Sequence, residues 1–124
     1  MTGLGNRVVP SLLARDMGET RRFYVDGLGF RVTGSYPDEE TPAWLELTRD
    51  GVSLQFYAEP PVGTPDRPTF SGTLYLYPDD VRALAEELRD RVPFSWGPEV
   101  MDYGMREFAV QDPNGYYIAF TEPA

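Results

Sequence analysis

The side chains that could do acid–base or nucleophilic chemistry in this chain are carboxylates, hydroxyls and amides. The sequence has no histidine and no cysteine, and all 11 of its basic residues are arginine. The commonest general base at neutral pH, the commonest metal ligands and the amine needed for a Schiff base are therefore missing. A general base would have to be Glu46, Asp102, Glu107 or a tyrosine. Such a carboxylate works near neutrality only where an apolar pocket raises its pKa.

Hydroxyl, amide and aromatic groups share one face of several segments that have the pattern of strands. Successive side chains of a strand point to opposite faces, so Ser53, Gln55 and Tyr57 lie together. Thr73 and Tyr75 lie together in the same way, opposite a purely aliphatic face that we expect beneath a helix. Apolar walls with a few orienting polar groups are typical of a small-molecule pocket.

We expect ten side chains to bind a ligand in this pocket. The walls are Trp44, Tyr57, Tyr75, Tyr103, Met105 and Trp96, the orienting groups are Ser53, Gln55 and Thr73, and Tyr36 lies at the mouth beside the acidic loop 38–40. For each aromatic residue the competing interpretation is ordinary core packing. For the acidic loop it is a solvated surface.

An internal repeat at an offset of 64 residues organises the chain. Asp16 falls on Asp80, each at the end of a short strand, and the dipeptide at 50–51 (Asp-Gly) falls on that at 114–115 (Asn-Gly). Both dipeptides are typical of type I′ hairpins. The same offset places Trp44 on Phe108, which suggests a symmetric core role for Trp44. Module one then spans about 6–58, a proline-rich linker 59–72, and module two about 73–122, all within a single domain of residues 1–124.

Each module is predicted to be βαβββ, so the fold class is α+β: two tandem modules forming a curved mixed sheet with a concave cavity. Asp16 and Asp80 are expected to cap the two helices. The first helix should end at Gly27 or Gly29, and the second carries an apolar stripe through Val92. The later strands are expected at 30–36, 43–49, 52–58, 94–101, 106–111 and 116–121.

Composition narrows the class of partner. A net charge of −9 disfavours nucleic acid and favours a neutral or cationic ligand. No apolar run approaches the roughly 20 residues that span a bilayer, and the first residues lack a secretory pattern. We therefore expect a cytoplasmic protein that binds a small molecule, without nucleic acid or membrane partners.

Two sequence runs resemble a known group, the glyoxalase, bleomycin-resistance and extradiol-dioxygenase (vicinal oxygen chelate) superfamily. VPSLLARD at 9–16, followed by RFYVDGLGF at 22–30, resembles its first-module signature. REFAVQDPNG at 106–115, followed by IAFTE at 118–122, resembles its last hairpin. The runs are most similar to those of bleomycin-resistance-type binding proteins.

The resemblance also implies where a metal would be bound. Metal-using members have a ligand on the first and fourth strands of each module, which here correspond to Val9, Gln55, Thr73 and Ala119. Two of these side chains cannot ligate, and two are weak neutral ligands. We therefore expect no metal and no cofactor.

The leading hypothesis is a metal-independent protein that sequesters an aromatic, antibiotic-like compound, with the acidic charge favouring a cationic one. The alternatives are a metal-free lyase or isomerase, for which Glu46 could serve as base, and an interaction module whose cavity is filled by its own tyrosines. The resemblance further implies a homodimer in which two chains build each cavity. Pro10 marks either a hinge, at which the first strand is exchanged between subunits, or an unexchanged edge strand.

Overall fold

The computed structural model describes residues 2–124. Module one contains two helical segments, α1 (Met17–Arg22) and its π-helical continuation η1 (Phe23–Gly27), and module two contains α2 (Val81–Leu88). The strands are β1 (Ser11–Leu13), β2 (Arg31–Tyr36), β3 (Trp44–Arg49), β4 (Val52–Tyr57), β5 (Thr73–Leu76), β6 (Trp96–Val100), β7 (Met105–Gln111) and β8 (Tyr117–Pro123).

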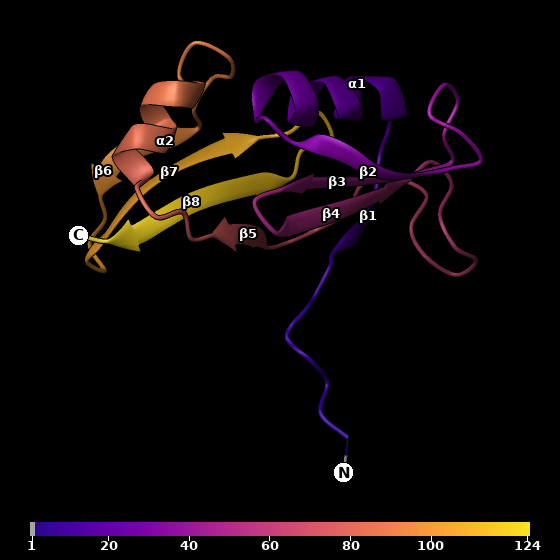
Figure 1. Ribbon diagram of the computed structural model, residues 1–124, viewed down its shortest axis with the longest axis horizontal. Coiled ribbons are helices and arrows are strands. Elements are labelled where there is room, and N and C mark those ends of the chain that lie inside the picture. Colours follow the sequence, from indigo (N-terminus) through magenta and orange to yellow (C-terminus); the bar gives the residue numbers. More distant parts are fainter. Residues whose placement is uncertain (1) are drawn as a thin grey trace.

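Each module forms its own four-stranded mixed sheet, so there are two sheets where one curved sheet was expected. The strand orders are β1-β4-β3-β2 and β5-β8-β7-β6, and in each sheet the first strand pairs in parallel with the fourth. Both helices lie on the same side of the sheets (Figure 1). The opposite side, which we call the open face, has no helix over it. The α+β class and the tandem βαβββ organisation are confirmed.

The two aspartates at the strand-to-helix junctions act as predicted. The Asp16 carboxylate accepts a hydrogen bond from the Glu19 amide at 2.9 Å, and Asp80 accepts one from the Ala83 amide at 3.0 Å. Each satisfies an amide at the helix start that has no partner within the helix. The first helix ends as expected, because the chain leaves it at Gly29, which has a φ of +78°.

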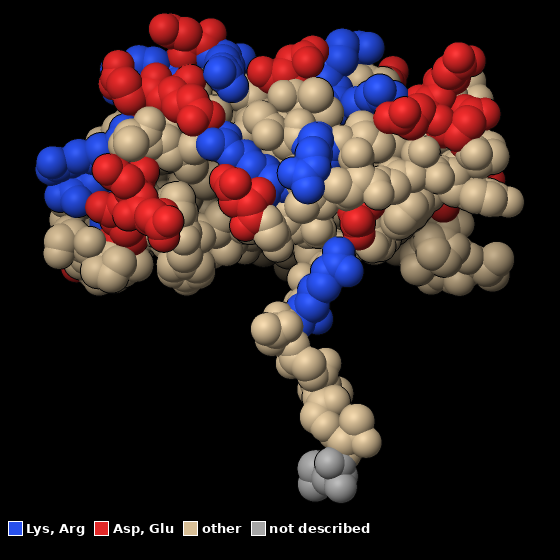
Figure 2. All heavy atoms as spheres, in the orientation of Figure 1, with Lys and Arg blue, Asp and Glu red and all other residues tan. Residues whose placement is uncertain are grey.

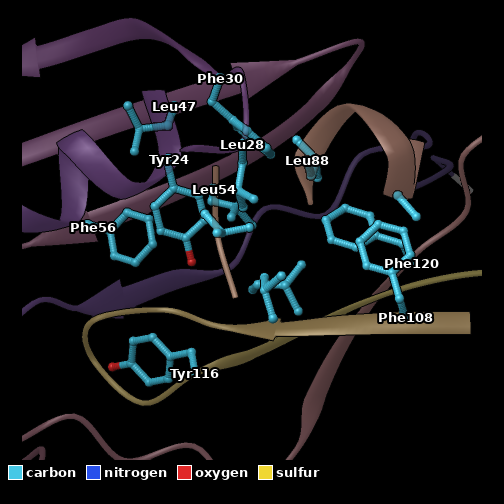
Figure 3. Close-up of a cluster of buried hydrophobic side chains, with 14 of the residues drawn as sticks. Tyr24, Leu28, Phe30, Leu47, Leu54, Phe56, Leu88, Phe108, Tyr116 and Phe120 are labelled. Atoms are coloured by element: carbon cyan, nitrogen blue, oxygen red, sulfur yellow. The ribbon is translucent and has the colours of Figure 1, made fainter. Parts of the chain in front are cut away.

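One hydrophobic core lies between the helices and both sheets. It combines Phe30, Leu47 and Phe56 of module one with Leu88 and Phe120 of module two, and Figure 3 shows these side chains converging. The aliphatic residues of β5 pack against this core, as the alternation predicted. The shared core joins the two modules into one folded unit.

A buried polar cluster also links the modules. Asp112, in the turn before β8, accepts a hydrogen bond from the hydroxyl of Tyr24 at 2.8 Å and bonds from the backbone amides of Asn114 and Tyr116, each at 2.9 Å. Asn114 in turn accepts a hydrogen bond from the backbone amide of Arg15 at 2.8 Å. The hairpin turn of module two is thereby fastened to η1 and to the junction between β1 and α1 of module one.

The repeat is less regular than the 64-residue offset predicts. The offset holds in the fourth strands, but Leu45 and Phe108 are the equivalent buried residues of β3 and β7, so the offset there is 63. Trp44 therefore corresponds to Glu107, and its expected symmetry with the core residue Phe108 is wrong. Trp44 is instead half-buried on the open face, opposite Tyr57.

The hairpin loop of module two is longer than that of module one, which restores the 64-residue offset in the fourth strands. Asp50 and Gly51 have φ values of +50° and +86°, as a two-residue type I′ turn requires, and this prediction is confirmed. In the other hairpin only Gly115 has a positive φ (+93°), within the longer loop 112–116. The prediction of a type I′ turn there is wrong, because the buried Asp112 cluster holds the loop in a wider conformation.

Two segments lie outside this framework. Residues 2–8 are exposed and extend away from the body on the side opposite the helices (Figure 1). The proline-rich segment 58–72 has no strand.

Acidic side chains gather mainly over the helices and adjoining loops in the view of Figure 2. None of the helices in residues 2–124 has the length and hydrophobicity needed to cross a bilayer.

The Asp112 cluster makes a prediction about stability. Replacing Asp112 with Ala would leave the Tyr24 hydroxyl and two backbone amides buried without an acceptor. We expect the free energy of unfolding to fall by about 3 kcal/mol. Urea denaturation measures this loss, with Asp66→Ala in the exposed linker as the control. A loss below about 1 kcal/mol would show that the cluster does not hold the modules together.

The same carboxylate predicts a pH dependence. Burial raises the pKa of Asp112 above its ordinary value, so the native state binds more protons than the unfolded state between the two pKa values. Stability from this group is thus greatest below the unfolded pKa and falls as pH rises through the native one. Between about pH 4 and pH 7, the wild type should lose stability relative to Asp112→Asn. Parallel urea titrations that show a constant difference between the two proteins would contradict this.

Candidate functional site

On the open face of module one, aromatic residues occupy one row across the sheet. Trp44 of β3 pairs with Tyr36 of β2 on one side and with Tyr57 of β4 on the other. Gly34 leaves room for the indole, since a Cβ at that position would lie 2.9 Å from the Trp44 ring. The row ends in solvent at Tyr36, which is 68% exposed.

The next row of module one is polar and centres on Glu46. One carboxylate oxygen accepts from the hydroxyl of Thr33 at 2.9 Å, and the other from the Gln55 amide and the Arg7 guanidinium, both at 3.1 Å. Hydroxyl contacts continue from Thr33 to Thr48 and on to Ser53. These side chains form one hydrogen-bonded sheet surface.

This environment does not suit Glu46 to act as a general base. Hydrogen bonds from Gln55 and Thr33, with a contribution from Arg7, hold its pKa below the ordinary value. A base that works near neutrality needs a raised pKa. The ionised carboxylate is better suited to accept hydrogen bonds or attract positive charge.

On the open face of module two, two alanines lie between two aromatic residues. The row runs from Tyr75 on β5 through Ala119 and Ala109 to Trp96 on β6. The Trp96 ring also lies 5.7 Å from that of Tyr117, centroid to centroid. Both alanines are completely buried in the isolated chain, so neighbouring side chains cover this row, which we call the trough.

Glu107 lies beside this trough in the neighbouring row. It is completely buried, and its two carboxylate oxygens accept from the indole of Trp96 and the hydroxyl of Tyr103, each at 2.8 Å. The hydrogen bond to Glu107 raises the pKa of Tyr103. The backbone of β6 comes close to β7 here, because a Cβ on Gly97 would collide with the Glu107 carbonyl.

The ten predicted site residues fall into two groups, one on each sheet. Module one holds Tyr36, Trp44, Ser53, Gln55 and Tyr57, and module two holds Thr73, Tyr75, Trp96, Tyr103 and Met105. In module one the strand register places Tyr36, Trp44 and Tyr57 side by side. In module two Tyr75 and Trp96 lie at the two ends of one row, the other strand residues lie in different rows, and Tyr103 lies in the turn between β6 and β7. The surfaces remain open in the isolated chain, where Tyr75 and Tyr103 are 43% and 59% exposed. The expected acidic mouth is a self-contained turn, in which Asp38 accepts from the amides of Glu40 and Thr41.

Sequence reasoning did not place Glu107 or Thr33 in the site. Glu107 was considered only as a base, and the 64-residue offset put it opposite the wrong residue. The sequence did carry one signal: Glu107 directly precedes the apolar run 108–110. A carboxylate in such a position is normally buried only when it has bonding partners. Thr33 lies at a β-bulge, and a bulge breaks the alternation on which the prediction relied.

The positions at which relatives bind metal do not fit a metal here. Gln55 and Ala119 hold equivalent positions on the fourth strands and face the open side, but alanine has no donor. The Gln55 amide already donates to Glu46. Val9 likewise has no donor atom on its side chain, which leaves Thr73 as a weak ligand.

A separate cavity of about 560 Å³ lies on the other side of the molecule, between the β3–β4 hairpin and α2. Its floor includes Phe30, Leu76 and Phe120, and its rim carries the ion pair of Arg49 with Glu87 at 2.9 Å. None of the ten predicted residues lines it.

Comparisons with known proteins agree with this geometry. The profile of the Glyoxalase/Bleomycin resistance protein/Dioxygenase superfamily matches residues 6–120. An antibiotic binding protein, TnmS3, from Streptomyces sp. CB03234 is 25% identical, with a TM-score of 0.75 and 100% of both chains covered. The bleomycin-binding protein of bleomycin-producing Streptomyces verticillus, solved with copper(II)-bleomycin, is 24% identical, with a TM-score of 0.68 over 100% of this chain and 99% of that one.

A third similar structure is TioX from Micromonospora sp. ML1, which is 19% identical with a TM-score of 0.75 over 97% of this chain and 100% of that one. No protein with a curated description matches the chain. The family profile covers nearly the whole sequence, and the two βαβββ modules agree with it. The chain belongs to the Glyoxalase/Bleomycin resistance protein/Dioxygenase superfamily.

Proposed function

We propose that this protein binds and sequesters a planar aromatic, antibiotic-like compound without the help of a metal. The observation that carries the proposal is the trough of module two, in which two alanines lie between the rings of Tyr75 and Trp96. The two alanines are covered in the isolated chain, so a planar ligand would displace the side chains above them and stack against the rings of Tyr75 and Trp96. Each aromatic pair adds roughly 0.5–1.5 kcal/mol beyond the area it buries. The similarity to TnmS3 and to bleomycin-binding proteins supports the same role.

Two chains build each cavity in this proposal, with the open face of module one from one subunit over that of module two from the other. Without a partner chain, aromatic residues such as Tyr75 and Tyr103 are exposed to water. Large exposed apolar groups commonly mark an interface or a ligand site. The homodimer would have two equivalent cavities related by a twofold axis. The exposed arm at 2–6 and the edge strand that follows Pro10 could contact the partner, while Arg7 pairs with Glu46 of its own chain.

A metal-free enzyme finds less support. The lowered pKa of Glu46 removes the candidate base on module one, and Gln55 and Thr33 occupy both of its oxygens. On each open face a hydroxyl does donate to a carboxylate, Thr33 to Glu46 and Tyr103 to Glu107, but the sequence has no histidine to act as a base near neutral pH. A binding role needs only the shape and the ring surfaces described above.

Tryptophan fluorescence tests the binding role, because each open face holds one of the two tryptophans. In Trp96→Phe only Trp44 reports, and in Trp44→Phe only Trp96 reports. Titration with bleomycin should quench both reporters with the same midpoint, equally in EDTA and in added zinc. Free tryptophan amide in the same buffer controls for absorption by the ligand. Quenching that requires zinc would overturn metal independence, and no response of either tryptophan would overturn the binding role for this ligand class.

A mixed dimer tests the shared cavity. Trp44→Ala and Trp96→Ala each damage one wall, so each homodimer should bind bleomycin weakly. In a dimer of one chain of each kind, one cavity has both defects and the other has neither. Random co-assembly should therefore restore about a quarter of the sites to wild-type affinity. Equilibrium dialysis counts these sites. If cavities lie within one chain, co-assembly restores none.

A further inference from the structure

Glu107 is a buried carboxylate with no counter-charge. Its side chain is completely inaccessible, and its only hydrogen-bond donors in residues 2–124 are the neutral groups of Trp96 and Tyr103. Across the described part of the chain, no arginine lies within 4 Å of its oxygens, and the adjacent Arg106 pairs with Glu122 at 3.1 Å. An ionised carboxylate taken out of water is costly unless it is fully paired.

Glu107 and its neighbour Thr121 also make fewer hydrogen bonds than their side chains allow. An ionised carboxylate can accept about four hydrogen bonds, and this one accepts two. Thr121, the cross-strand partner of Glu107 on β8, is 2% exposed, and its hydroxyl has no hydrogen-bond partner. Most buried polar atoms in proteins do have a partner. The carboxylate of Glu107 and the hydroxyl of Thr121 can therefore accept further hydrogen bonds beside the aromatic trough.

The equivalent half-site of module one is built differently. Glu46 has three donors, one of which is the cationic Arg7. Glu46 thus has a cationic partner, whereas Glu107 has none among the described residues.

We propose that Glu107 selects ligands that carry a positively charged nitrogen, which lies on the rings of Trp96 and Tyr75 and is neutralised by this carboxylate. The inference rests on the proposed binding function and adds the residue that determines specificity. Cations are attracted to aromatic faces and more strongly so where water is excluded. Tyr103, 59% exposed and next to Gly104, covers the carboxylate until the ligand donates in its place.

A matched pair of three-ring probes tests the inference by isothermal titration: proflavine, which is a planar cation near neutral pH, and acridone, which is a neutral molecule of similar shape. The wild type should bind proflavine about tenfold more tightly than acridone. Glu107→Gln, which keeps the side-chain shape, should abolish this preference by weakening proflavine, with acridone changed by less than about twofold.

Two further variants make the result specific. Asp102→Asn removes the same charge from the exposed loop next to Tyr103 and should leave the preference unchanged. Tyr103→Phe removes one donor from the carboxylate without altering the core, so the preference for proflavine should increase. This second test stands even if Glu107→Gln does not fold.

The outcomes separate the two proposals. If both probes bind the wild type equally, or if Glu107→Gln weakens them by the same factor, the role of Glu107 is wrong and the binding function stands. An unchanged or smaller preference in Tyr103→Phe would count against Glu107 in the same way. If neither probe binds the wild type, the aromatic-binding function itself fails, and the role of Glu107 fails with it.

Discussion

The buried carboxylate of Asp112 is the constraint on which the arrangement of the two modules depends. It receives the Tyr24 hydroxyl from the first helix and two backbone amides from its own turn, so one group fastens both halves of the repeat. A hydrophobic core alone would tolerate small sliding of one sheet against the other. Directional hydrogen bonds in a dry interior do not, because each misplaced donor would be left without a partner. The two open faces are thereby held in a constant relation.

The repeat has kept its framework and diverged in its chemistry. Capping aspartates, parallel first-to-fourth strand pairing and the shared core are common to both modules. The third strands differ by a shift of one residue, which places Glu107 where the other module has Trp44. Because strand side chains alternate, a shift of one changes which residues lie on the open face. One open face consequently carries a polar network with a cationic partner, and the other an aromatic row beside a carboxylate without one.

Because the two open faces differ, the proposed dimer would place two unlike surfaces around each ligand. A cavity built from module one of one subunit and module two of the other brings unlike surfaces together, so each ligand would meet hydrogen-bonding groups on one side and rings on the other. Two identical surfaces facing each other would present either the hydroxyl network or the trough twice. The net charge of −9 adds a general attraction for cations, and the role that we propose for Glu107 would add a local one.

Much of this protein was readable from its sequence, since local patterns carry local structure. The two capping aspartates, the Asp50–Gly51 turn and the aliphatic face of β5 follow from short-range preferences and were predicted correctly. The shared face of Ser53, Gln55 and Tyr57 followed from alternation. The burial of Glu107, the bulge beside Thr33 and the wide turn around Asp112 did not, because each depends on contacts with another strand or the other module. The sequence determined which side chains share a face of each sheet. Tertiary packing decided which carboxylates on those faces have cationic partners, because that depends on burial and on donors that are distant in the sequence.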